Sequence, residues 1–184
     1  MVVDADGERL AESLTDRLDA VTFTDLTTDQ VTARLIDAVV EWAGEQGWRV
    51  YRRAPSVLRL PPPMSAQQSV LDVACARPDG PPVVVEIDHS TRRRTWEKLL
   101  AEADAGRIAL WVRWGAGRLT APPAPIQMVT CEVSRRSDPT GRGWVHSRSP
   151  RADKLPPAHS DVPVGPVAAV ELPLPPPEST DAGS

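Results

Sequence analysis

The chain has 184 residues, 25 of them acidic and 21 basic, with a net charge of −4. That length suits one domain of ordinary size with additional segments. Two cysteines, Cys75 and Cys131, are too few for a disulfide framework, so we expect a protein of the reducing cytoplasm. The first residues (MVVDADGERL) lack a signal-peptide pattern. No apolar stretch approaches the roughly 20 residues of a membrane span, so no membrane partner is expected.

Charge is unevenly distributed along the chain. Residues 1–47 contain 3 basic and 11 acidic residues, whereas residues 48–118 contain 12 basic and 7 acidic ones. A basic surface favours a polyanionic partner such as a nucleic acid. The alternative is that these arginines are ordinary surface residues, in a chain that uses arginine where other proteins use lysine. Charge alone leaves both interpretations open.

The N-terminal third predicts two helical segments and a strand. Residues 1–26 are acidic and weakly amphipathic, with leucines at helical spacing, and we expect an arm or a short helix there. Thr27 and Gln30 have the spacing of a capping box at the start of a strongly amphipathic helix. Gly47 occupies the expected C-terminal capping position. Trp48–Tyr51 then reads as a first strand.

Five further segments complete the predicted domain. Ser69–Ala76 and Val83–Asp88 flank a turn that contains Asp-Gly and prolines, which is typical of an antiparallel hairpin. A helix is predicted over residues 90–106. Arg107–Trp114 and Ile126–Val133 are predicted strands. The order helix, strand, strand, strand, helix, strand predicts an α/β fold with a mixed sheet flanked by helices, since a helix between the third and fourth strands permits a parallel crossover.

The folded domain is therefore expected over residues 27–133, after an N-terminal arm or helix over residues 1–26. Residues 134–184 are expected to form a disordered tail, because 13 of the 20 prolines lie after residue 120 and little there can form a core. The run Leu172–Pro177 favours polyproline II. Such a tail is either a linker or a ligand for a protein partner.

Three acidic residues of the hairpin carry the functional prediction. With Asp79 at the centre of the turn, Asp72 falls directly opposite Glu86, and Asp88 shares the face of Glu86. Like charges opposite each other destabilise a hairpin, and a bound divalent cation is the simplest compensation. The alternative is an ordinary polar face of an edge hairpin. Glu41, beside the apolar stripe of the first strongly amphipathic helix, is either a further ligand or a surface glutamate.

This succession of elements, with Glu41 on the helix, Asp72 on the second strand and Glu86-Ile87-Asp88 on the third, resembles the PD-(D/E)XK nuclease superfamily, which has the restriction-endonuclease-like fold. The resemblance covers residues 28–115, and part of it is also similar to the nuclease-like module of plasmid replication-relaxation proteins. It implies DNA phosphodiester hydrolysis that depends on Mg²⁺ or Mn²⁺. Asp72 and Glu86 would hold the metal, with Glu41 as an additional ligand through water.

Residue 88 departs from the family's pattern, because Asp88 stands where these nucleases usually have a lysine that positions or deprotonates the attacking water. Aspartate can act as a base or as a further metal ligand, but it supplies no positive charge. A second interpretation is therefore a catalytically inactive nuclease-like module that binds DNA or a protein, and a third is a purely structural interaction domain. The neighbouring His89 alternates away from Asp88, so we expect it to be structural.

Basic residues at the start of the second strongly amphipathic helix are candidates for nucleic-acid binding. Arg92, Arg93 and Arg94 lie in a first helical turn, where cations oppose the helix dipole and where phosphate groups bind. We expect them to contact DNA phosphates, with a solvated charge run as the alternative. Lys98 adds charge to the same helix, but it lies on the side opposite Trp96, so we expect it to point to solvent.

Overall fold

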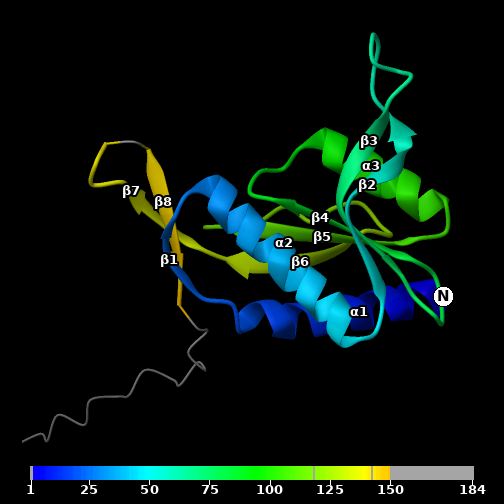
Figure 1. Cartoon of the computed structure of the whole chain (residues 1–184), viewed down its shortest axis with the longest axis horizontal. Coiled ribbons are helices and arrows are strands. Elements are labelled where there is room, and N and C mark those ends of the chain that lie inside the picture. The colour runs from blue at the N-terminus through cyan, green and yellow to red at the C-terminus, as the bar shows by residue number, and fades with distance from the viewer. Residues whose placement is uncertain (1, 118, 142, 150–184) are drawn as a thin grey trace, which may run out of the picture. The chain divides into compact units, whose positions relative to one another are not determined.

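The computed structural model describes residues 2–117, 119–141 and 143–149, which belong to the compact unit Met1–Ala152. Helices pack on both sides of a sheet, and a smaller sheet lies beside it (Figure 1). The elements are, in chain order, α1 (Val2–Asp19), β1 (Phe23–Leu26), α2 (Thr28–Glu45), β2 (Arg49–Arg59), β3 (Gln68–Ala76), β4 (Val83–Asp88), α3 (Arg93–Asp104), β5 (Ile108–Gly115), β6 (Gln127–Glu132), β7 (Ser134–Ser137) and β8 (Trp144–Arg148).

The main sheet has five strands in the order β2-β3-β4-β5-β6. β3 is antiparallel to both β2 and β4, whereas β5 is parallel to both β4 and β6. Helix α3 connects β4 to β5 and makes the parallel crossover that the order of elements predicted. The mixed α/β fold class is therefore confirmed.

Helices bury both faces of this sheet. α1 and α2 pack on one face, where Leu14, Leu35, Val85 and Leu110 are fully buried. α3 packs on the other face, over a smaller core that contains Leu71, Val84, Leu99 and Trp111. A strand buried on both faces needs apolar residues at successive positions rather than alternate ones. This explains the continuous apolar runs of β4 and β5.

Helix α2 begins as the sequence indicates, whereas α1 departs from the prediction. The backbone N–H of Gln30 donates to Oγ1 of Thr27 at 3.3 Å, and Oε1 of Gln30 accepts from the backbone N–H of Thr27 at 2.9 Å, so the predicted capping box is present. α1 is part of the domain rather than an arm, because Leu10, Leu14 and Leu18 are at most 4% exposed. The N-terminal boundary predicted at residue 27 is therefore wrong.

The C-terminal boundary predicted at residue 133 is also wrong. β7 pairs with β8, and β8 pairs with β1, so these three strands form a second sheet. All four residues of β7 are exposed, which leaves the segment without the apolar pattern by which strands are recognised. The rest of the predicted tail, residues 150–184 with the run Leu172–Pro177, lies outside the described residues.

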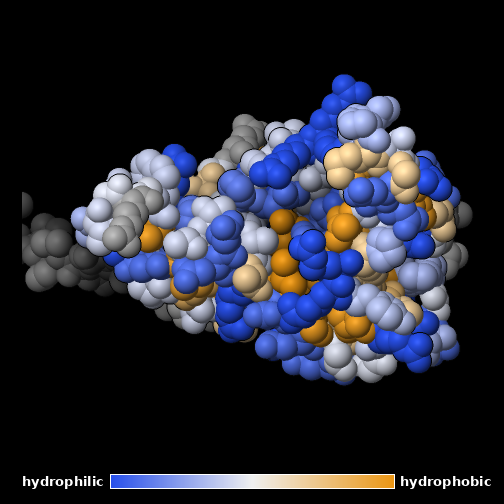
Figure 2. All heavy atoms as spheres, turned by 45° about the horizontal axis from the view of Figure 1, so that its top comes forward, coloured by the Kyte–Doolittle hydropathy of each residue, from blue (hydrophilic) through white to orange (hydrophobic). Residues whose placement is uncertain are grey.

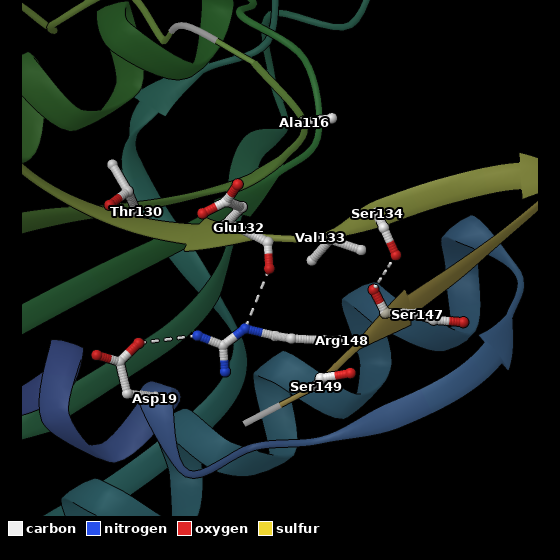
Figure 3. A pocket seen from close by; sticks show the side chains of 9 residues that line it. All are labelled: Asp19, Ala116, Thr130, Glu132, Val133, Ser134, Ser147, Arg148 and Ser149. Carbon is white, nitrogen blue, oxygen red and sulfur yellow. Dashed lines mark hydrogen bonds and ion pairs between the residues drawn. The ribbon is translucent and has the colours of Figure 1, made fainter. Parts of the chain in front are cut away.

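Arg148 of β8 joins the second sheet to the end of α1 (Figure 3). Its Nη1 donates to the backbone oxygens of Leu18 and Val21. Its Nη2 lies 2.9 Å from Oδ1 of Asp19, and its Nε donates to the backbone oxygen of Glu132 at 3.2 Å. The last carbonyls of a helix lack partners within the helix, so this guanidinium completes the end of α1.

The surface mixes residue types. On the face shown in Figure 2, hydrophilic residues separate the hydrophobic ones. The large hydrophobic side chains that are exposed among the described residues are Tyr51, Val57, Met64, Val70 and Trp144. None of the described helices has the length and apolar character needed to cross a bilayer.

Candidate functional site

The β3–β4 hairpin has the predicted register, since Val73 pairs with Val85. At the next pair of positions, Asp72 and Glu86, hydrogen bonds from backbone to side chain take the place of those between the two backbones. Oδ2 of Asp72 accepts a hydrogen bond from the backbone N–H of Ile87 at 2.8 Å. In return, Oε1 of Glu86 accepts one from the backbone N–H of Asp72 at 3.2 Å. These two hydrogen bonds fix the predicted carboxylates of Asp72 and Glu86 at the point where β3 and β4 separate.

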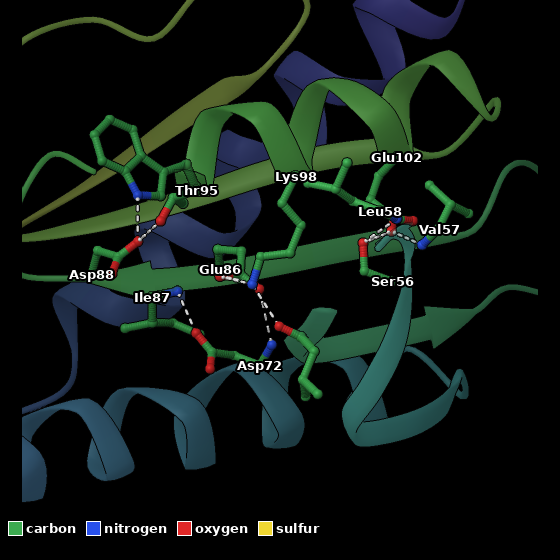
Figure 4. Close-up of polar contacts among 12 residues, drawn as sticks. Ser56, Val57, Leu58, Asp72, Glu86, Ile87, Asp88, Thr95, Lys98 and Glu102 are labelled. Atoms are coloured by element: carbon green, nitrogen blue, oxygen red, sulfur yellow. Dashed lines mark hydrogen bonds and ion pairs between the residues drawn. The ribbon is translucent and has the colours of Figure 1, made fainter. Parts of the chain in front are cut away.

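Lys98 reaches this carboxylate pair from α3 (Figure 4). Its Nζ lies 2.8 Å from Oε2 of Glu86 and also donates to the backbone oxygen of Val70. The side chains of Lys98 and Glu86 are only 10% and 7% exposed. The prediction that Lys98 points to solvent is wrong, and the structure places it against the residues predicted to bind metal.

The face of α3 that meets the sheet is largely polar, which explains the error. Glu102 is fully buried, where its Oε1 accepts from the Ser56 hydroxyl at 2.6 Å and from the Val57 backbone N–H at 2.8 Å, and it also pairs with Arg107. Burial is tolerated when each polar group has a partner. An apolar stripe centred on Trp96 misses this face. The buried residues of α3 are Thr95, Lys98, Leu99 and Glu102.

The carboxylate of Asp88 contacts α3 and β5. Its Oδ2 accepts hydrogen bonds from Oγ1 of Thr95 at 2.9 Å and from Nε1 of Trp111 at 3.3 Å. No cluster of three or more histidine, cysteine or acidic residues suited to a metal ion occurs in the described part of the chain. The expected convergence of three carboxylates is therefore reduced to the pair of Asp72 and Glu86.

Burial makes negative charge costly at this pair. Desolvation, followed by the charge of Asp72, raises the pKa of Glu86 to about 7, although Lys98 acts in the opposite direction. Desolvation also raises the pKa of Asp72, against the hydrogen bond from Ile87 and the charge of Lys98. Since one ammonium group faces two carboxylates, a further cation would stabilise their ionised forms.

The pair opens into a pocket of about 390 Å³. Arg92 and Arg94, from the start of α3, line this pocket. Arg93 does not, because its side chain is 92% exposed and pairs with Glu97 at 2.9 Å. Of the three predicted phosphate-binding arginines, two are thus brought to the pocket. The lining residues are Thr28, Asp29, Thr32, Asp72, Glu86, Ile87, Asp88, His89, Arg92, Arg94, Thr95 and Lys98.

Glu41 lies elsewhere. Its carboxylate pairs with Arg17 of α1 at 2.6 Å and is 51% exposed, so it joins two helices at the surface. It is not among the residues that line the pocket.

A larger cavity of about 470 Å³ surrounds Arg148, but that guanidinium is already bound by protein acceptors. The carboxylate pocket is therefore the better candidate for chemistry.

Comparison with protein-family models and with curated proteins found no match to this chain. A functional conclusion therefore depends on the geometry of the pocket lined by Asp72, Glu86 and Lys98. The sequence predicted that Asp72 lies opposite Glu86, whereas it missed the position of Lys98. The polar series Thr95, Lys98 and Glu102, at helical spacing, was the signal that pointed to it.

Proposed function

We propose that this domain hydrolyses DNA phosphodiester bonds with the help of Mg²⁺ or Mn²⁺ at the pocket of Asp72, Glu86 and Lys98. The observation that carries the proposal is the buried carboxylate pair with the Lys98 ammonium 2.8 Å from Glu86. Lys98 supplies, from α3, the positive charge that residue 88 lacks. Enzymes of phosphoryl transfer depend on such placed charges, because the transition state accumulates negative charge on oxygen.

The order of elements supports a restriction-endonuclease-like arrangement. α2, β2, β3, β4, α3 and β5 follow one another as in the resemblance to the PD-(D/E)XK superfamily, and β4 and β5 are parallel. Asp72 lies on β3 and Glu86 on β4, at the two positions that the superfamily pattern requires. The lysine is displaced from the strand to the following helix.

The donor set suits a hard divalent cation. Within the described residues Asp72 uses only Oδ2 for hydrogen bonds, so Oδ1 remains for a ligand. Mg²⁺ commonly binds one or two carboxylates, keeps several waters and also contacts the substrate phosphate, so Asp72 and Glu86 suffice to hold it. When bound, such an ion would lower the pKa of a coordinated water and neutralise charge on the phosphate.

Other pocket residues bind and orient the substrate in this proposal. The Nζ of Lys98 can donate to the attacking water or to a phosphate oxygen beside Glu86. Arg92 and Arg94 can donate hydrogen bonds to phosphate through the nitrogens that do not already bind Ser90 Oγ and the backbone oxygen of Arg59. The N-terminal turns of α2 and α3 also line the pocket, and the positive ends of their dipoles favour an anion there. Asp88 holds α3 in place through Thr95.

A thermal-shift titration with Mn²⁺ and Mg²⁺ tests the metal site. Saturable stabilisation is expected in the wild type and should disappear in Asp72→Asn and Glu86→Gln. A metal concentration of 100 times the Kd should raise the free energy of unfolding by about 2.7 kcal/mol. Asp37→Asn is the matched control, because Asp37 is an exposed carboxylate that pairs with Arg52 outside the pocket. Cleavage of plasmid DNA in Mn²⁺ should be lost in the two pocket variants and retained in the control.

A catalytically inactive DNA- or protein-binding module is the alternative. The closed ion pair of Lys98 and Glu86 favours it, because each group satisfies the other without a ligand. Such a module would bind DNA equally well with and without metal and would show no saturable thermal shift. That combination of results would replace the catalytic proposal.

A further inference from the structure

We propose that a second pocket, beside the carboxylate pocket, binds a neighbouring phosphate group of the same nucleic-acid strand. This inference rests on the proposed function. The pocket measures about 290 Å³ and lies between the end of β5 and the β7–β8 hairpin. Its ionisable lining residues are His89, Arg113, Arg135 and His146.

The lining of this second pocket is basic and contains no carboxylate among the described residues that form it. Arg113 and Arg135 each carry a full positive charge, which attracts an anion into a concave site. Burial lowers the pKa of His146, and the nearby charges of His89 and Arg135 lower it further. Because these effects disfavour the protonated form of His146, a bound anion would stabilise that form and strengthen the positive charge of the pocket.

Arg113 has hydrogen-bonding capacity to spare. Its Nη1 donates to the backbone oxygens of Asp88 and Trp114. Its Nε is buried and has no hydrogen-bond partner among the described residues. Desolvation lowers the pKa of this guanidinium. An anion beside Arg113 would stabilise the charged form of the guanidinium, which desolvation disfavours.

The two pockets share a wall. His89 lines both of them. Thr28 lines the carboxylate pocket, and its Oγ1 lies 3.2 Å from Nε2 of His146, which lines the second pocket. A nucleic-acid strand with one phosphate at Asp72 and Glu86 would therefore bring an adjacent phosphate to the second pocket.

The β7–β8 hairpin favours a nucleic-acid strand over a free phosphate ion. Arg135 pairs directly with His146 across the two strands, and Trp144 shares the face of His146. Trp144 is 53% exposed, and the guanidinium of Arg135 lies 4.8 Å from its ring centroid. An exposed aromatic ring beside basic side chains is the arrangement on which unpaired bases stack.

Oligonucleotide binding by Arg135→Gln tests this inference. Arg136→Gln is the matched control, since Arg136 follows on the same strand, points to the other face and pairs with Asp25 at 2.6 Å. Binding of the full chain to a fluorescein-labelled single strand is followed by anisotropy in EDTA, so that no cleavage occurs. Arg135→Gln should weaken binding roughly tenfold, as expected for one charge-assisted contact, and reduce the salt slope by about 1.

Each outcome bears on one proposal at a time. Specific loss of binding in Arg135→Gln supports the second pocket even if metal-dependent cleavage is never observed. Equal effects of the two substitutions, or no oligonucleotide binding by the wild type either in EDTA or in Mg²⁺, would overturn it. Cleavage that depends on Asp72 but not on Arg135 would also overturn it and leave the catalytic proposal standing. Thermal stabilisation by inorganic phosphate without oligonucleotide binding would reject a nucleic-acid ligand. Because Arg135 is exposed, thermal unfolding should confirm that the variant is folded.

Discussion

Replacing Glu86 with glutamine should remove a large part of the pH dependence of folding. In the folded protein, burial and the charge of Asp72 raise the pKa of Glu86 from 4.5 to about 7. Between these two values the folded state binds more protons than the unfolded state, so the stability from this group falls as pH rises. Glu86→Gln keeps the shape of the side chain but does not titrate.

Linkage gives the size of the effect. A pKa of about 7 in the folded state and 4.5 in the unfolded state lowers the free energy of unfolding by about 2.5 kcal/mol between pH 5 and pH 8. The other ionisable groups are common to both proteins, although Asp72, which interacts with Glu86 through its charge, also titrates differently in the variant. The stability of Glu86→Gln relative to the wild type should therefore rise by about 2.5 kcal/mol over this range.

Urea unfolding at pH 5, 6, 7 and 8 in EDTA measures this difference, with tryptophan fluorescence as the probe because Trp111 and Trp114 are buried. Glu97→Gln is the matched control, since Glu97 belongs to α3 but is 42% exposed and pairs with the solvent-exposed Arg93. The control should follow the wild type at every pH. A difference between Glu86→Gln and the wild type that stays constant from pH 5 to pH 8 would refute the buried carboxylate pair.

Three further substitutions test the placement of individual residues. Lys98→Met should lower the free energy of unfolding by about 3–5 kcal/mol in urea at pH 8, because buried Glu86 loses its ion-pair partner and must either stay charged in a desolvated site or take up a proton. A cost below about 1 kcal/mol, as for an exposed ion pair, would contradict the burial. Leu14→Ala should cost about 2–5 kcal/mol, since Leu14 is fully buried, and a value near zero would show that α1 is dispensable. Glu41→Gln should change stability by less than about 1 kcal/mol and leave any Mn²⁺-induced thermal shift intact; loss of that shift would return Glu41 to the metal site.

The β3–β4 hairpin was predictable because its determinants are local. An Asp-Gly turn between two apolar runs sets the register, and the observed pairing of Val73 with Val85 has the same centre at Asp79. The capping box at Thr27 is equally local. The parallel crossover followed from the order of elements alone, since two parallel strands need a long connection.

The site was only partly predictable, because Lys98 is buried by interactions with residues far away in the sequence. Hydrophobic periodicity assigns a helix face by its apolar residues, whereas α3 buries polar side chains that bind Glu86 on β4 and Ser56 on β2. Nothing near residue 98 in the chain reveals those partners. The β7–β8 hairpin was missed for a related reason, since its neighbour in the sheet, β1, precedes it by more than a hundred residues.

The contacts of Arg148 have a consequence for the order in which the chain folds. The hydrogen bond from Arg148 to the backbone oxygen of Val21 spans 127 positions in the sequence. During synthesis α1 and β1 emerge before β8, and neither can complete its hydrogen bonding until β8 has left the ribosome. Contacts between such distant segments form slowly, because a long loop must close first. Helix α1 and strand β1 of the nascent chain therefore depend on β8 for their final hydrogen bonds, and a chain stopped before residue 144 would leave the end of α1 without the Arg148 guanidinium.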